Sequence, residues 1–235
     1  MRCFRLAIVA LSLVLGGCSW MGNWFQGGED NSTPPAALAS FTPSLVVETL
    51  WSTRVGVGSN KQFVKLVPAV AQDRVYAADR KGRVVAVDAA SGRPAWDVGT
   101  GARISAGPGM GEGLVLVGTS DGELLALDST DGTLKWRASV SSEVLSVPQA
   151  LDGVVVVATM DGKVFGLEAA DGGQRWVYDR TVPVLALRGA SSPALTHGRA
   201  IGGFASGKLA SLDLRDGRPQ WEATIAVPRG RSELE

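Results

Sequence analysis

A four-residue signature recurs four times in this chain of 235 residues and constrains its fold more than any other feature. Counted from a first Gly, each copy has an acidic residue at +6, a second Gly at +10 and a Trp at +14. The copies are Gly82/Asp88/Gly92/Trp96, Gly122/Asp128/Gly132/Trp136, Gly162/Glu168/Gly172/Trp176 and Gly207/Asp213/Gly217/Trp221. The tryptophans are 40, 40 and 45 positions apart, and a period near 40 is typical of one propeller blade.

Each copy also predicts local β-structure. Asp121-Gly122 and Asp161-Gly162 supply the positive φ of a tight hairpin turn. Apolar runs rich in β-branched residues precede them, at 114–117 and 154–158, as in strands that are covered on both faces. One such sheet cannot bury both of its faces alone, so the sheets must stack. The sequence therefore predicts an all-β protein, a β-propeller of four-stranded antiparallel blades, with about four blades in residues 44–235.

The repeated acids and tryptophans are expected to be structural. Each acid ends a strand before a turn, where a carboxylate can accept hydrogen bonds from backbone N–H groups, and the blades keep the acids on separate sheets. Each Trp is expected to pack between neighbouring blades instead of forming an aromatic ligand box. Acid–base catalysis by these residues is therefore not predicted.

The other motifs that could carry a function do not predict a catalytic, metal-binding or nucleotide-binding site. The segment 202–208 resembles the start of a phosphate-binding loop, but Leu209 stands where Ser or Thr would bind Mg²⁺, and Gly207-Lys208 is in register with the other hairpins. His197 is the single histidine, so without a second His and without a free Cys in the mature chain a zinc site is not predicted, and His197 is expected to be a solvated loop residue beside Gly198. The formal net charge is zero, which disfavours nucleic-acid binding. We expect no cofactor, no metal and no enzymatic activity.

The N-terminus has the pattern of an export signal. Residues 1–17 combine Arg2 and Arg5 with an apolar run at 6–15, which is too short to span a bilayer. The junction at 15–18, Leu-Gly-Gly-Cys, resembles the lipobox of bacterial lipoproteins, and that resemblance implies acylation of Cys18. An ordinary secretory leader with an incidental Cys is the alternative.

The segment after Cys18 is expected to be a tether. Residues 18–43 are rich in Gly, Ser, Asn and Pro, without hydrophobic periodicity. In 44–57, Trp51 lies 45 positions before Trp96 and matches the Trp end of a repeat that lacks its upstream strands. We expect a strand here that closes a larger ring, and hence a chain that is the N-terminal part of a longer propeller. A closed four-bladed ring is the alternative.

One interval departs from the repeat. The 45-residue step between Trp176 and Trp221 places its surplus around 182–193, and insertions in a repeat array map to loops on one face, which is often the binding face. Leu185, Leu187 and Arg188 in this segment are candidate partner contacts. An ordinary strand with buried leucines is the alternative.

The unit G-x-L-x-A-L-D-x-x-x-G-x-x-x-W at 122–136 resembles the repeats of quinone-dependent (pyrroloquinoline quinone) dehydrogenases. Together with the lipobox, the tether and the segment 182–193, it makes the whole chain resemble the N-terminal half of the BamB family. These proteins are lipoprotein subunits of the outer-membrane β-barrel assembly machinery, with eight blades and no quinone.

The resemblance implies a partner and a location. Members of the family dock on the periplasmic POTRA domains of the barrel subunit BamA through an L-x-L-R element, which falls here on Leu185, Leu187 and Arg188. Other subunits of the machinery and unfolded outer-membrane clients are further implied partners. Ser19 after the acylated Cys18 implies anchoring to the outer membrane, on its periplasmic side. The alternatives are a periplasmic quinoprotein enzyme, which would carry adjacent cysteines, and a propeller scaffold of another envelope complex.

Overall fold

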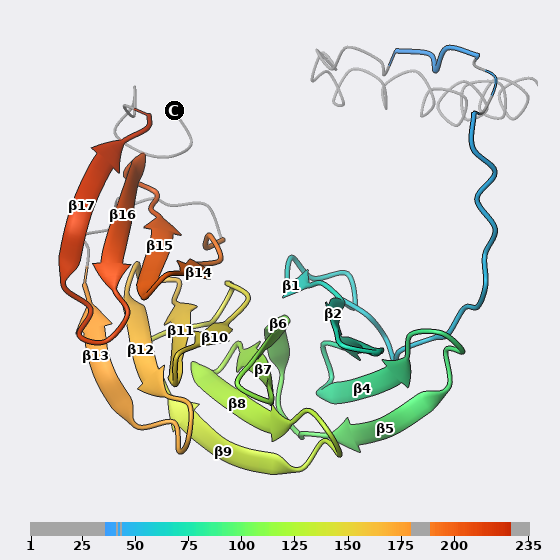
Figure 1. Cartoon of the computed structure of the whole chain (residues 1–235), viewed down its shortest axis with the longest axis horizontal. Helices are drawn as coiled ribbons and strands as arrows, with labels where there is room; N and C mark the ends of the chain where they lie inside the picture. The colour runs from blue at the N-terminus through green and yellow to red at the C-terminus, as the bar shows by residue number, and fades with distance from the viewer. Residues whose placement is uncertain (1–35, 41, 43, 180–188, 227–235) are drawn as a thin grey trace, which may run out of the picture. The chain divides into compact units, whose positions relative to one another are not determined.

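The computed structural model describes residues 36–40, 42, 44–179 and 189–226, and the chain divides into two units, Met1–Glu48 and Thr49–Glu235. The described residues of the first unit are exposed and contain no helix or strand. The described residues of the second unit are built from 17 β-strands, β1 to β17 (Figure 1). No helix in the described ranges is long and apolar enough to cross a membrane.

The strands form four sheets in which each strand pairs antiparallel with the next along the chain. The first sheet contains β2 (Ala69–Ala71), β3 (Arg74–Ala78), β4 (Arg83–Asp88) and β5 (Pro94–Gly99). The second contains β6 (Ile104–Gly111), β7 (Leu114–Thr119), β8 (Glu123–Asp128) and β9 (Leu134–Ser139). The third contains β10 (Gln149–Leu151), β11 (Val154–Ala158), β12 (Val164–Glu168) and β13 (Gln174–Tyr178). The fourth contains β14 (Ala194–Thr196), β15 (Arg199–Gly203), β16 (Lys208–Asp213) and β17 (Pro219–Thr224). The predicted four-stranded antiparallel blades are confirmed.

The sheets pack face to face in chain order, and a hydrophobic cluster fills each interface. Strand β7 shows why its sequence is continuously apolar. Val115 and Val117 pack with the first sheet, whereas Leu114 and Leu116 pack with the third. Successive side chains of a strand point to opposite faces, so a strand between two sheets has no polar side.

The repeated Trp closes each interface by binding the turn of the following sheet. In every case its indole Nε1 donates to the carbonyl of the residue that directly follows the repeated acid. The pairs are Trp51–Ala89 at 2.9 Å, Trp96–Ser129 at 3.0 Å, Trp136–Ala169 at 2.9 Å and Trp176–Leu214 at 2.9 Å. Trp96, Trp136 and Trp176 are 6–8% exposed, whereas Trp221 is 38% exposed because no described turn covers it.

The second Gly of the repeat lies under this Trp. Gly172 has a φ of +76°, and a Cβ added there would lie 2.6 Å from Cε3 of Trp136. The equivalent pairs are Gly92 with Trp51, Gly132 with Trp96, and Gly217 with Trp176. Glycine at this position therefore satisfies both the left-handed turn and the close approach of the ring.

The segment before the first sheet differs from expectation. Residues 44–57, expected to supply a closing strand, form no strand in the structure. Trp51 nevertheless binds the first sheet as the other tryptophans bind theirs. Strand β1 (Lys65–Leu66) precedes the first sheet in the sequence but does not join it. It pairs in parallel with β6 as a fifth strand of the second sheet.

Candidate interaction surface

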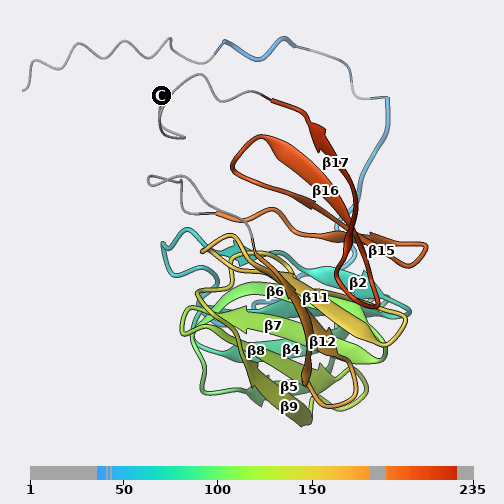
Figure 2. The ribbon, with the colours of Figure 1, turned by 90° about the vertical axis from the view of Figure 1, so that its left-hand side faces the viewer.

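One edge of the sheets carries both the tight hairpins and the connections between sheets. The hairpins join the second and third strands of each sheet, and the connections leave from the fourth strand beside them. Thr100 N donates to Gly82 O at 2.8 Å, and Val140 N donates to Gly122 O at 2.8 Å. We call this edge the turn edge. Loops from several sheets therefore lie together on this edge. Figure 2 shows the stacked sheets from another side.

The hairpins of the turn edge are fixed by polar side chains that the sequence analysis missed. Asp79 Oδ1 accepts hydrogen bonds from the backbone N–H groups of Lys81 and Arg83, both at 2.9 Å. Thr119 Oγ1 accepts from Glu123 N at 3.0 Å in the next sheet. Asp79, Thr119 and Thr159 are at most 3% exposed, and each lies three positions before a hairpin Gly. That recurrence was a usable signal, although Phe204 replaces the polar residue in the fourth sheet.

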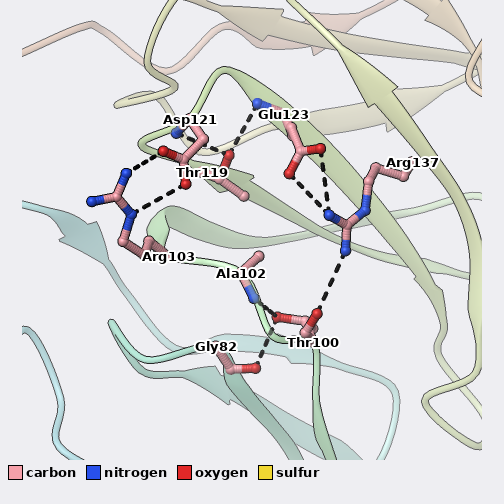
Figure 3. Close-up of polar contacts among 8 residues, drawn as sticks. All are labelled: Gly82, Thr100, Ala102, Arg103, Thr119, Asp121, Glu123 and Arg137. Atoms are coloured by element: carbon pink, nitrogen blue, oxygen red, sulfur yellow. Dashed lines mark hydrogen bonds and ion pairs between the residues drawn. The ribbon is translucent and has the colours of Figure 1, made fainter.

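Ion pairs tie the first two sheets together at this edge (Figure 3). Arg103 in the connection forms a bidentate contact with Asp121 of the next hairpin, and this hydrogen bonding lowers the pKa of the Asp121 carboxyl. Arg137 Nη1 lies 3.0 Å from Glu123 Oε2, and its Nη2 donates to Thr100 O at 3.5 Å. The connection between the first two sheets is therefore held from both sides.

The candidate partner contacts Leu185, Leu187 and Arg188 lie outside the described residues, and so does Cys18. The chain on either side of the first three is well attached to the turn edge. Before them, Asp179 Oδ2 is 3.7 Å from Lys163 Nζ. After them, Ser191 Oγ donates to Gly203 O at 2.7 Å and accepts from Gly203 N at 3.1 Å, and Ser192 Oγ accepts from Val147 N at 2.9 Å.

Three of the four repeated acids bind turn backbone as predicted. Asp88, Asp128 and Asp213 accept hydrogen bonds from backbone N–H groups of their turns, at 2.7, 2.7 and 2.9 Å. Glu168 differs, since its longer side chain pairs with Arg175, Oε1 accepting from Nε at 2.6 Å. Within the described ranges no group of three His, Cys, Asp or Glu is placed to hold a metal ion.

The hydrogen bonds of Asp128 predict an acid-sensitive interaction. Lys135 and the backbone of Thr130 hold the pKa of Asp128 at about 2, below its ordinary value of 3.8. A depressed folded-state pKa contributes stability that is complete above about pH 4 and is lost as the pH falls towards 2. We expect Asp128→Asn to flatten the dependence of melting temperature on pH between 4 and 2, and Lys135→Gln to do the same. An unchanged slope in both variants would contradict the assignment.

Comparison with known proteins gives consistent matches. A family model described as outer membrane protein assembly factor BamB matches residues 48–102 and 80–235. Curated proteins of that name from Pseudomonas aeruginosa and Alkalilimnicola ehrlichii are 54% identical over 97% of this chain and 56% identical over 100% of it. The chain spans 58% and 59% of the lengths of these two relatives. A crystal structure of BamB from Moraxella catarrhalis superposes with a TM-score of 0.67 at 29% identity, covering 74% of this chain and 52% of that chain.

Proposed function

Because this chain belongs to the BamB family of outer membrane protein assembly factors, we propose that it is a non-enzymatic scaffold of the machinery that inserts β-barrel proteins into the outer membrane. The observation that carries the proposal is the match to the family over nearly the whole chain. The repeated residues are consistent with a scaffold, because the tryptophans and the second glycines of the repeat join one sheet to the next.

The finer proposal concerns the partner and the anchor. We infer that Leu185, Leu187 and Arg188 contact the POTRA domains of BamA, and that acylated Cys18 holds the protein on the periplasmic face of the outer membrane. In support, Asp179 and Ser191 on either side of the first three residues are attached to the turn edge. Apolar anchors beside a planar cation with several donors are typical of an interface hot spot. Other subunits and unfolded barrel clients would bind the same assembly.

The interface proposal predicts a loss of binding without a loss of folding. Leu187→Ala or Arg188→Glu should each weaken binding to purified POTRA domains of BamA by about 2 kcal/mol, as for hot-spot residues. The melting temperature should change little, because surface substitutions move stability by about 0.5 kcal/mol. Binding is measured by calorimetry and folding by thermal melts of the same samples.

Matched controls are available in the described sheets. Leu134 is an exposed leucine at the start of β9, and Arg215 is an exposed arginine in the turn after β16, both away from the turn edge. Leu134→Ala and Arg215→Glu should leave POTRA binding unchanged. If Leu187 instead belongs to a core, its truncation should cost roughly 2–5 kcal/mol of stability, with the folded fraction binding normally. That result would refute the interface.

The quinoprotein alternative has less support. The sequence has Cys3 and Cys18 and no adjacent cysteine pair. The repeated acids are engaged in turns and ion pairs on separate sheets. A quinone-binding assay on the full chain would separate this alternative from the scaffold proposal.

A further inference from the structure

A small cavity opens on the turn edge where three separate segments meet. Asn60 and Gln62 come from the loop before β1, Arg80 and Lys81 come from the hairpin of the first sheet, and residues 101–103 come from the connection to the second sheet. The cavity has a volume of about 400 Å³. Its lining residues include three cations and two carboxamides but no carboxylate, so the cavity has a basic and polar lining that suits an anion.

Two of the cations have no ion-pair partner in the described part of the chain. Arg103 is neutralised by Asp121, as described above. Arg80 donates one hydrogen bond, from Nη1 to Ile104 O at 3.4 Å, and its Nε is buried without a hydrogen-bond partner among these residues. Lys81 is exposed at the rim. Two cations that line one cavity without an ion-pair partner favour an external anion, because hydrogen bonds between charged groups are stronger than those between neutral groups.

Two acids lie close to these cations, and both are already engaged: Asp121 pairs with Arg103, and Asp79 binds backbone N–H groups. Asp79 is 3% exposed, and its oxygens accept hydrogen bonds from three backbone N–H groups, those of Val57, Lys81 and Arg83. It therefore fixes the cavity wall instead of binding Arg80. The same carboxylate attaches the loop to the hairpin, where Arg80 N also donates to Gly58 O at 2.9 Å. The walls of the cavity are thus held in place before a ligand arrives.

We propose that this cavity binds a carboxylate side chain in an acidic, extended segment of a protein partner, with Arg80 and Lys81 as the charged donors. A guanidinium and an ammonium provide charge-assisted hydrogen bonds to a carboxylate. Asn60 and Gln62 at the rim can pair with the peptide groups on either side of it. Such a site would be separate from the assembly function proposed above, and it can be measured without any component of the assembly machinery.

A protein segment suits the surroundings better than a lipid surface. Segments that bind anionic bilayers carry clusters of about 4–8 basic residues. Here the ion pairs Arg83–Asp97 and Arg103–Asp121 flank the two free cations, so the charge is local instead of spread over the face. A single discrete anion fits such a site.

The test measures binding of a labelled hexapeptide of alternating Glu and Gly to the full chain in detergent, by fluorescence anisotropy. A peptide with Gln in place of Glu is the neutral control. We expect the acidic peptide to bind, the neutral one not to bind, and raised salt to weaken binding. The double variant Arg80→Gln/Lys81→Gln should weaken binding at least about tenfold, the scale of one lost charged hydrogen bond.

Two further variants keep the result interpretable. Lys81→Gln removes only an exposed ammonium and should weaken binding without a change in melting temperature. Arg215→Gln/Arg218→Gln removes two charges from side chains that are 87% and 85% exposed in the fourth sheet, and should bind like wild type. Equal losses in both double variants, or equal binding of the two peptides, would overturn the proposal. Binding of phosphatidylglycerol vesicles that is lost in Lys81→Gln, with no peptide binding, would overturn it in favour of a lipid headgroup.

Discussion

Replacing Trp136 by alanine is expected to lower the free energy of unfolding by about 3–5 kcal/mol, the usual cost of truncating a buried Trp. The ring is 7% exposed and packs in the cluster between the second and third sheets. Its indole N–H binds Ala169 O, so truncation also leaves that carbonyl without its donor. Urea denaturation at constant m-value measures the change.

The repeat itself supplies the control for this experiment. Trp221 occupies the same position in the fourth sheet but is 38% exposed, and no described turn receives its indole. Trp221→Ala should therefore cost much less, about 1 kcal/mol. Equal losses in the two variants would show that the ring stabilises its own sheet and not the interface with the next one.

A substitution at Gly172 tests the residue that lies against the Trp136 ring. Gly172→Ala places a Cβ 2.6 Å from the Trp136 ring and forces alanine to a φ of +76°. In the Trp136→Ala background only the backbone cost remains, about 1 kcal/mol. The double variant should therefore lose less stability than the sum of the single variants, as expected for residues in contact. Strict additivity would contradict the close approach.

Replacing Cys18 by serine is expected to move the protein from the membrane fraction to the soluble periplasmic fraction. Multiple acyl chains hold a protein on a bilayer stably, and this variant would lose all of them. Cys3→Ser is the matched control, since Cys3 lies within the predicted leader and should have no effect. Fractionation after a carbonate wash measures the outcome, and mass spectrometry of the N-terminal peptide measures the acylation.

Two outcomes of that experiment would contradict the anchor. Recovery of Cys18→Ser in the washed membrane fraction would mean that another segment holds the protein there. Release of the wild-type protein along with both variants would favour an ordinary secretory leader with an incidental cysteine.

The sequence predicted the repeating part of the fold because its signature reports local constraints. A hairpin Gly, a turn acid and a buried Trp each need a particular residue type, so they recur at fixed spacing. The receptor of each Trp was not predicted, although Gly172 and Ala169 show that it lies in the turn of the following sheet. The Trp and its acceptor belong to different repeats, so the residue spacing within one repeat does not indicate that they are in contact.

The parts outside the repeat were predicted poorly for a related reason. Strand β1 has two residues, too few for a periodic pattern, and its pairing with β6 is a long-range contact. The cavity at Arg80 combines three segments that are separate in sequence, and Asp79 reads as a surface residue beside Arg80 and Lys81 until its burial is known. Cys18 and Leu187 remain predictions, because their support comes from sequence resemblance.

The route of the chain into the first sheet has a mechanical consequence. Tension applied from the N-terminal side at Thr49 does not reach β2 directly. It meets the Trp51–Ala89 hydrogen bond, then the Val57–Asp79 hydrogen bond, and then the parallel pairing of β1 with β6. The first two attachments are to turns of the first sheet and the third is to the second sheet, so all three resist the load before β2 itself is pulled. In a protein held by its N-terminal end, a pulling force would have to break these contacts before it could peel β2 from β3.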